Sequence, residues 1–241
     1  MPLPGKRLFT QISAQKTGGG AGFALPSQAI VAFGPQWGLS LGKPNTPAGD
    51  PMGYALKSDT STGWPDAAFT IRDADDADME AVQAIYAHFV LTSPATFEEV
   101  PPSLPEMKMR RAGVLASSLP FLVAEADGLV VGFCYASPYR SRAAYRHTVE
   151  DSIYVSEAFG GRGVGSALLG QLIARCEAGP WRQMLAVMGT GRNEACIALH
   201  RSLGFSNVGT LKAVGLKFGQ WEDTVMMQRH LGEGEWSLPR E

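Results

Sequence analysis

Apolar side chains between residues 71 and 136 recur first at helical spacing and then at strand spacing. A first helix is indicated by apolar positions three or four residues apart: Val82, Ile85, Tyr86, Phe89 and Val90. Asp75 or Asp76 can cap its start, and Ser93-Pro94 ends it. A second amphipathic helix is predicted after Pro105.

Two strands are predicted next, over residues 121–125 and 129–136, and Asp127-Gly128 between them is a strong signal for a tight antiparallel hairpin. Further strands are predicted over residues 152–155, 183–188, 208–218 and 221–228, and further helices over residues 163–176 and 193–203. Gly204 can end the last helix in the left-handed conformation. The order strand, helix, strand across residues 152–188 predicts a right-handed parallel crossover. We therefore expect an α+β (α/β three-layer) fold, with a mixed central sheet flanked by helices.

The first 68 residues differ from the rest in composition. They contain 11 glycines and 8 prolines and show no sustained periodicity, which is typical of a poorly ordered segment. A chain of 241 residues can hold one domain with such an appendage. We expect a Gly/Pro-rich, disordered N-terminal extension at residues 1–68, one folded domain at residues 69–232 and a C-terminal tail at residues 233–241.

Charge and composition argue against several classes of protein. A net charge of -2 and a pI near 6.1 give no positive field for a polyanion, so no nucleic acid partner is expected. The apolar patch at residues 29–33 is too short and too far along the chain for a signal peptide, and no run approaches a membrane span. We therefore expect a cytoplasmic protein without membrane contact. Cys134, Cys176 and Cys196 lack metal-ligand spacing, which predicts reduced, structural thiols and no metal.

The strongest chemical signal is a strand, loop and helix around residue 160. Residues 151–155 read DSIYV, residues 160–166 read GGRGVGS, and an apolar run follows at residues 167–173. The helix would begin without an acidic side chain in its first turn. Free backbone N–H groups and the helix dipole would then converge on one point, which favours an anion such as a pyrophosphate.

Two familiar phosphate-binding loops are excluded by residue identity. A Walker loop ends in Gly-Lys-Ser/Thr, whereas Gly165 is followed by Ser166 and Ala167. A Rossmann loop would continue from Gly163 and Gly165 to a glycine or alanine at position 168, which is Leu168.

The remaining pattern resembles the acetyl-CoA loop of the GNAT superfamily of N-acetyltransferases, and the resemblance extends over about two thirds of the chain. It is closest to the phosphinothricin and methionine sulfoximine N-acetyltransferase branch. The other motifs that carry it are IRDADDAD at 71–78, FLVAEADG at 121–128, YRSRAAYRHTVE at 139–150, Asn193 with ALHRSLGF at 198–205, and GQWED at 219–223. One departure is Gly160, where the superfamily usually has Gln or Arg. The resemblance implies the GNAT fold, acetyl-CoA as co-substrate and a homodimer.

It also implies where acetyl-CoA binds. The strand at residues 153–155 would splay from its neighbour and expose backbone groups to the pantetheine arm, with the Val155 amide facing the thioester carbonyl. The cofactor-binding residues implied by the resemblance are Ile153, Tyr154, Val155, Gly161, Arg162, Gly163, Val164, Gly165, Ser166 and Asn193. Asn193 would bond the pantetheine; its position at a helix start also suits an N-cap.

Acetyl transfer to an amine requires a base, donors for the oxyanion and a proton for the departing thiolate. Glu150 matches the carboxylate that this branch is thought to use as its base. Asp151 is its rival, on the opposite face if the strand has begun, and either carboxylate could merely solvate the start of the strand. His200 stands where this branch has a histidine, which implies a general acid or a group polarising the thioester. A histidine near a helix C-terminus is also favoured by the helix dipole alone.

We expect a group of arginine and aromatic side chains to select the substrate. An α-amino acid with a second acidic or zwitterionic head requires a cationic pocket, and arginine bonds carboxylate or phosphinate oxygens in pairs. The candidates are Phe97, Arg140, Arg142, Tyr145 and Arg146. Such a loop can also be a solvated surface or a dimer contact.

Three functions compete. The first is an acetyl-CoA-dependent N-acetyltransferase of a small amino acid such as phosphinothricin or methionine sulfoximine. The second keeps this chemistry with a polyamine, an aminoglycoside or a protein N-terminus as acceptor, and the arginines argue against cationic acceptors. The third is a non-catalytic acyl-CoA-binding regulatory module, which the combination of Glu150, Asn193 and His200 disfavours.

Overall fold

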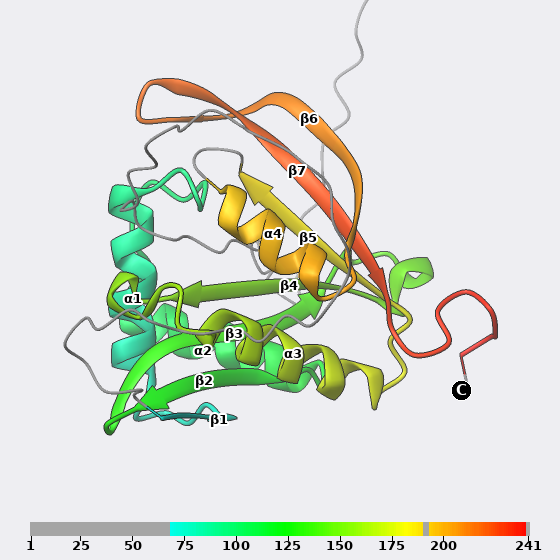
Figure 1. The fold of residues 1–241 in the computed structure, drawn as a ribbon, viewed down its shortest axis with the longest axis horizontal. Coiled ribbons are helices and arrows are strands. Elements are labelled where there is room, and N and C mark those ends of the chain that lie inside the picture. The colour runs from blue at the N-terminus through cyan, green and yellow to red at the C-terminus, as the bar shows by residue number, and fades with distance from the viewer. Residues whose placement is uncertain (1–67, 190–192, 240–241) are drawn as a thin grey trace, which may run out of the picture.

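A computed structural model describes residues 68–189 and 193–239 (Figure 1). Its strands are β1 (Phe69–Asp73), β2 (Phe121–Ala126), β3 (Leu129–Pro138), β4 (Thr148–Val155), β5 (Gln183–Gly189), β6 (Ser206–Lys217) and β7 (Gln220–His230). Its α-helices are α1 (Met79–Thr92), α2 (Leu104–Ala116), α3 (Val164–Glu177) and α4 (Glu194–Ser202). The disordered extension predicted for residues 1–68 lies outside the described residues, apart from its last position. No described helix has both the length and the apolar composition needed to cross a membrane.

The strands form one sheet in the order β1-β2-β3-β4-β5-β7-β6. Neighbouring strands pair antiparallel except β4 and β5, which are parallel and are joined through α3. The predicted mixed sheet and parallel crossover connection are therefore confirmed. In the view of Figure 1, α3 and α4 lie across the near face of the sheet.

Side-chain alternation along the central strands assigns each helix to a face. On one face, the Tyr154 ring of β4 packs against Tyr86 and Phe89 of α1, with ring centroids 5.0 and 5.7 Å apart. On the other face, Cys134 of β3 contacts the Leu168 carbonyl oxygen of α3. The apolar positions predicted for the first helix are indeed its buried or half-buried positions. The core thus fills both sides of β3 and β4.

Most predicted elements agree with the structure within a few residues, and two expectations were wrong. Strand β4 begins at Thr148 rather than residue 152, so Glu150 and Asp151 lie within it. Helix α1 begins at Met79, so neither Asp75 nor Asp76 is its cap. Strand β1 was not predicted. The Asp127-Gly128 hairpin is confirmed, with φ of 51° and 76°.

All three cysteines, Cys134, Cys176 and Cys196, are buried and free of disulfides, as predicted. Burial raises the pKa of Cys176 to about 12 and the pKa of Cys134 well above its usual value. These two thiols therefore stay protonated and behave as small hydrophobic groups.

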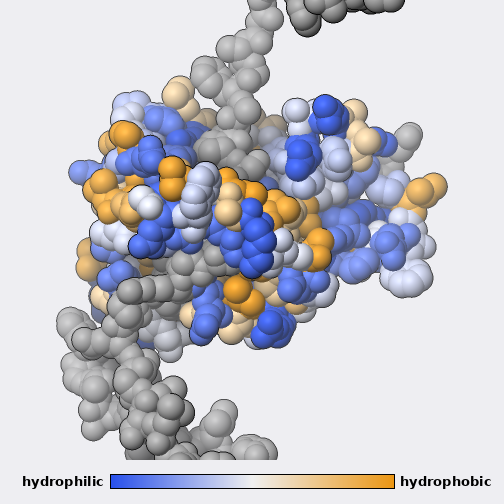
Figure 2. All heavy atoms as spheres, turned by 90° about the horizontal axis from the view of Figure 1, so that it is seen from above, coloured by the Kyte–Doolittle hydropathy of each residue, from blue (hydrophilic) through white to orange (hydrophobic). Residues whose placement is uncertain are grey.

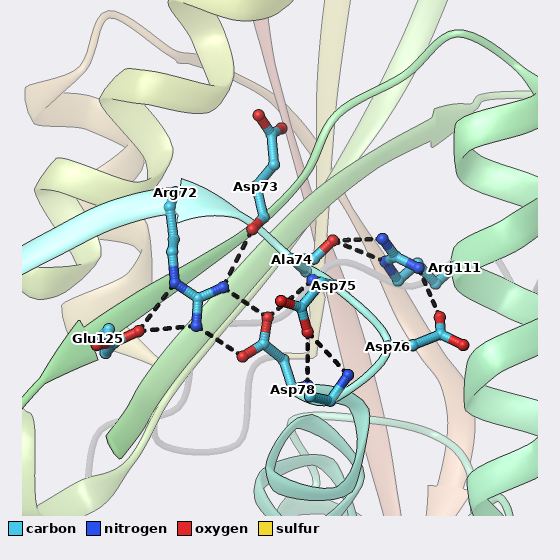
Figure 3. A network of polar contacts seen from close by, with 9 residues as sticks. Arg72, Asp73, Ala74, Asp75, Asp76, Asp78, Arg111 and Glu125 are labelled. Atoms are coloured by element: carbon cyan, nitrogen blue, oxygen red, sulfur yellow. Dashed lines mark hydrogen bonds and ion pairs between the residues drawn. The ribbon is translucent and has the colours of Figure 1, made fainter. Parts of the chain in front are cut away.

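The aspartates before α1 form a turn instead of a cap, because Arg72 engages the residue that follows them (Figure 3). Arg72 donates from both terminal nitrogens to the Asp78 carboxylate at 2.7 Å each, and from Nε to Glu125 at 2.8 Å. Asp75 accepts from the amides of Ala77 and Asp78. Arg72 therefore ties β1 to β2 and to the start of α1.

Substitution of Asp78 by asparagine tests this network. We expect a loss of about 1.5–3 kcal/mol in the free energy of unfolding at neutral pH, the range for hydrogen bonds to charged groups. The Arg72 guanidinium beside Asp78 holds the pKa of that carboxyl below its usual value. Its contribution is therefore complete above about pH 4, the unfolded pKa, and is lost as pH falls through the lower folded pKa.

The measurement is urea unfolding of wild type and Asp78→Asn across this pH range. Asp73→Asn is the control, since Asp73 is 61 % exposed in its pair with Arg175, and we expect it to cost less than about 1 kcal/mol. Equal losses for the two variants would refute the stabilising role of the network.

Candidate functional site

The parallel pairing of β4 with β5 ends early. It joins Thr148 to Gln183, Val149 to Met184 and Glu150 to Leu185, and no later pair. Beyond these positions β4 stays paired with β3, and β5 stays paired with β7. The sheet therefore opens into a fork, bounded by residues 151–155 on one side and 186–189 on the other.

Backbone groups of β4 point into this fork. The Ser156 amide donates to the Val131 carbonyl oxygen at 2.8 Å, and hydrogen-bonded pairs alternate with non-hydrogen-bonded pairs in an antiparallel ladder. Given the register of β3 with β4, the N–H and C=O groups of Asp151, Ile153 and Val155 face away from β3. The groups of Ile153 and Val155 have no strand partner on that side among the described residues, so an extended polar ligand could bond there.

The glycine loop lies between the end of β4 and α3. Gly161 and Gly163 have φ of 73° and 81°, the left-handed region that glycine adopts without strain. The first helical hydrogen bond runs from the Ala167 amide to the Gly163 carbonyl oxygen, and the first turn has no acidic residue and no side-chain cap. The amides of residues 164–166 therefore present the anion site that the sequence predicts. Arg162 lies exposed beside them, over the Phe159 ring at 5.1 Å.

Glu150 lies at the base of the fork and is 1 % exposed. Its side chain shares the α1 face with Ser152 and Tyr154, by the alternation of the strand. Burial raises the pKa of Tyr135; the Ser152 hydroxyl and Arg110 oppose this rise, whereas Glu150 and Glu98 add to it. Glu150 therefore lies among polar and charged side chains that surround Tyr135 on this face. The sequence had not singled out Tyr135 or Arg110, although strand alternation places Tyr135 on this face.

Asp151 points to the opposite face, where it meets His200 of α4. The His200 Nε2 atom lies 3.0 Å from Asp151 Oδ2, and both side chains have no exposed surface. The other ring nitrogen, Nδ1, lies 2.9 Å from the Cys196 carbonyl oxygen. Burial is the largest single effect and works against a charged His200, but the adjacent Asp151 carboxylate and Cys196 together outweigh it and hold the pKa of His200 well above its ordinary value. Asp151 is thus engaged away from Glu150.

Asn193 immediately precedes α4 and is 2 % exposed. Its side-chain amide donates to the Gly189 carbonyl oxygen at 2.8 Å, and it makes no side-chain cap bond. Asn193 therefore ties the start of α4 to the end of β5, on the second arm of the fork.

The substrate candidates lie in two separate segments. Arg140, Arg142, Tyr145 and Arg146 are exposed on the β3–β4 connection. Arg140 donates to the Tyr139 hydroxyl at 3.2 Å, which raises its pKa, and Glu150 adds a smaller electrostatic contribution. Phe97 comes from the α1–α2 connection and packs against Gly189 and Gly215. The structure thus places the arginine candidates on one exposed connection and Phe97 on a different segment.

The comparison with known families and proteins agrees with this geometry. Residues 82–205 match the family described as Acetyltransferase (GNAT) family. The chain is 54% identical over 172 residues to a phosphinothricin N-acetyltransferase of Alcaligenes faecalis, covering 71% of this chain and 87% of that protein. It is 38% identical over 167 residues to an L-methionine sulfoximine/L-methionine sulfone acetyltransferase of Salmonella typhimurium, covering 68% and 95%.

A solved structure is similar as well. A GNAT superfamily phosphinothricin acetyltransferase from Sinorhizobium meliloti, crystallised in complex with acetyl-CoA, superposes with a TM-score of 0.69 at 47% identity. The match covers 72% of this chain and 94% of that one.

Substitution of Gly163 by valine tests the anion site. A β-branched residue does not adopt a φ of 81° without strain, so the loop must change and the amides of residues 164–166 must move. We expect the dissociation constant for acetyl-CoA, measured by calorimetry, to rise about tenfold or more, the equivalent of one lost charge-assisted hydrogen bond.

Gly170→Ala is the matched control, because a Cβ at this helical position meets nothing within 4 Å. Unchanged binding by a folded Gly163→Val protein would show that the pyrophosphate does not sit on this loop.

Proposed function

The chain belongs to the acetyltransferase (GNAT) family, and from this premise we propose that it transfers the acetyl group of acetyl-CoA to the α-amino group of phosphinothricin or methionine sulfoximine. The observation that carries the proposal is the fork between β4 and β5, with Glu150 at its base and the glycine loop at its mouth. The named relatives supply the substrate class.

In this proposal acetyl-CoA lies along the fork. Its pyrophosphate accepts hydrogen bonds from the amides of residues 164–166, and its pantetheine arm bonds the backbone of residues 153–155 and the Asn193 side chain. The Val155 amide faces the thioester carbonyl and stabilises the oxyanion. Arg162 adds positive charge near the phosphates, where Gly160 offers no side chain.

Glu150 is proposed as the general base. It removes a proton from the substrate ammonium, and the neutral amine attacks the thioester carbon. A C–N bond forms, the C–S bond breaks, and the thiolate of coenzyme A takes up a proton. Glu150 is 1 % exposed, so this proton transfer takes place away from bulk water.

The general-acid role predicted for His200 remains a prediction. Its raised pKa favours the charged ring with both nitrogens protonated, and both nitrogens face acceptor oxygens. Its complete burial and its contact with Asp151 favour a further role, in which the pair fixes α4 against β4. Asp151, the rival base, is proposed to serve this pair.

The acceptor is proposed to bind on the α1 face beside Glu150. Its acidic head would meet the arginine-rich β3–β4 connection, and Arg140 is the first candidate there because the charge of Glu150 helps to raise its pKa, after the larger effect of Tyr139. Arg142, Tyr145 and Arg146 are the further candidates on this connection, and Phe97 approaches from the α1–α2 connection.

We further propose a homodimer of the catalytic domain at residues 69–232. The β6–β7 hairpin carries exposed large apolar side chains, namely Val208, Leu211, Val214, Leu216, Phe218 and Trp221. Figure 2, seen from the side where β6 and β7 lie, shows hydrophobic residues gathered among hydrophilic ones. Exposed apolar surface of this kind marks interaction sites.

The substrate assignment is tested by release of free thiol from acetyl-CoA with a panel of acceptors. We expect kcat/KM to be highest for phosphinothricin or methionine sulfoximine and low for a polyamine or an aminoglycoside. Arg140→Ala should raise the KM for the preferred amino acid by about 10- to 100-fold with little change in kcat, as for a charged contact made equally in ground and transition states.

Arg201→Ala is the control, since Arg201 is exposed at the end of α4. A preference for cationic acceptors would contradict the substrate class. Binding of acetyl-CoA without turnover of any acceptor would favour the non-catalytic module.

The catalytic role of Glu150 is tested by Glu150→Gln. We expect kcat to fall by about 10²- to 10⁴-fold, the range for a lost general base. Acetyl-CoA affinity should stay unchanged. The residual rate should rise with pH, because free amine accumulates without help from the enzyme.

Two companion variants make this result specific. Glu157→Gln, at a half-exposed carboxylate paired with His88, should keep normal turnover. Asp151→Asn tests the rival. Normal turnover of Glu150→Gln together with a pH-dependent loss in Asp151→Asn would transfer the role of base to Asp151.

A further inference from the structure

Lys217 is a buried lysine between exposed residues of the β6–β7 hairpin. It is the last residue of β6 and is 2 % exposed, whereas its neighbours Leu216 and Phe218 are 55% and 59% exposed. Burial lowers the pKa of its ammonium, and Glu99 and Glu98 oppose this change. Lysines are rarely buried without partners, so the contacts of this one carry information.

Its hydrogen-bond partners are two backbone carbonyl oxygens that lie more than 120 residues earlier in the sequence. The Lys217 Nζ atom donates to the Ser93 carbonyl oxygen at 2.8 Å and to the Thr96 carbonyl oxygen at 2.6 Å. Ser93 is the C-cap of α1. A cation is favoured at a helix C-terminus by the dipole and by the unpaired carbonyls there. Lys217 thus pins the segment at residues 93–98, which follows α1, to β6.

The same segment is tied to both helices that it connects. The Thr96 hydroxyl lies 3.1 Å from the Tyr86 hydroxyl of α1. Glu98 forms a hydrogen-bonded ion pair with Arg110 of α2, at 2.8 Å. Residues 93–98 are therefore attached to α1, to α2 and, through Lys217, to β6 of the C-terminal hairpin.

Phe97 of this segment occupies a slot that two glycines create. A Cβ at Gly215 of β6 would lie 2.5 Å from the Phe97 ring, and a Cβ at Gly189 of β5 would lie 3.3 Å from that ring. The Gly189 Cβ would also lie 2.8 Å from the Pro94 carbonyl oxygen. Neither strand has room for a side chain while Phe97 is in place.

The slot is close to the proposed reaction site. Gly189 ends β5, one arm of the fork, and accepts the Asn193 hydrogen bond. Burial is the main cause of the raised pKa of Tyr135, and Glu150 and Glu98, which is one residue from Phe97, both add to it. The position of residues 93–98 therefore sets where Phe97 lies against the β5 arm of the fork.

We propose that Lys217 is a positioning residue for the acceptor amino acid: its ammonium fixes residues 93–98 on β6, so that Phe97 forms one wall of the acceptor site. This inference rests on the function proposed above. It predicts that loss of the ammonium affects acceptor binding and leaves acetyl-CoA binding intact, because the cofactor contacts lie on β4, α3 and α4.

The test replaces Lys217 by methionine, which keeps an unbranched stem and removes the donors. We expect the KM for the preferred amino acid to rise about tenfold or more, as displaced positioning groups do, with an unchanged acetyl-CoA dissociation constant. Hydrogen exchange at residues 95–98 should accelerate. Lys212→Met is the matched control on the same strand, since Lys212 is 76% exposed, and it should change none of these readouts.

An unchanged KM would overturn the proposal in favour of a purely structural lysine. So would a rise in KM that is accompanied by parallel losses of acetyl-CoA affinity and melting temperature. Hydrogen exchange needs no substrate, so it tests the positioning role of Lys217 independently of the proposed function. If the wild type acetylates no amino acid, the proposed function fails. Normal exchange at residues 95–98 in Lys217→Met overturns the Lys217 proposal whatever the acceptor.

A double-mutant cycle of Gly215 and Phe97 tests the proposal if the Lys217→Met protein does not fold. Gly215→Ala should push the Phe97 ring from its slot and raise the amino acid KM. In a Phe97→Ala background the added methyl group meets no ring, so Gly215→Ala should then have little further effect. Additive effects of the two substitutions would contradict the coupling of Phe97 to β6.

Discussion

The early end of the β4–β5 pairing is the constraint on which the rest of the site depends. Each strand keeps its outer neighbour, so the sheet stays continuous at Glu150 and Leu185 and opens beyond them. A buried backbone group without a partner costs about 1–3 kcal/mol. The fork therefore leaves hydrogen-bonding capacity along Ile153 and Val155, which an extended ligand can satisfy. The glycine loop lies at the mouth of the fork and Asn193 lies on its second arm, so both border the space that such a ligand would occupy.

The alternation of β4 then divides two adjacent carboxylates between two tasks. Glu150 faces the α1 side with Tyr135 nearby, whereas Asp151 faces α4 and meets His200. A shared face would have placed two negative charges together. Opposite faces keep Glu150 apart for its proposed role as base, while Asp151 neutralises the buried His200 ring. In the proposed function the acceptor side is built separately, from the β3–β4 connection and from residues 93–98.

Local signals predicted most of the fold and part of the site. Helical spacing in α1, the Asp127-Gly128 turn and the glycine loop before α3 are properties of neighbouring residues, so the sequence contains them directly. The start of β4 was predicted late because Glu150 and Asp151 are unusual inside a buried strand. Their burial depends on tertiary partners. The predicted cap of α1 was wrong because Arg72, which lies on β1, engages Asp78 directly before the helix.

Contacts between distant segments could not be predicted from the sequence. Lys217 and Ser93 are 124 residues apart, and the slot for Phe97 combines two glycines from different strands. Only the packed sheet brings them together. The resemblance to known acetyltransferases predicts which residues bind the cofactor, but it did not show that His200 is fully enclosed with Asp151.

A crystal structure of the protein with acetyl-CoA tests the central claim most directly. The account predicts a pantetheine arm in the fork, hydrogen-bonded to the backbone of β4, with the thioester carbonyl at the Val155 amide and the acetyl group near Glu150. The pyrophosphate should lie on the amides of residues 164–166. A cofactor bound elsewhere, with the β4–β5 fork closed by added strand pairing, would contradict it.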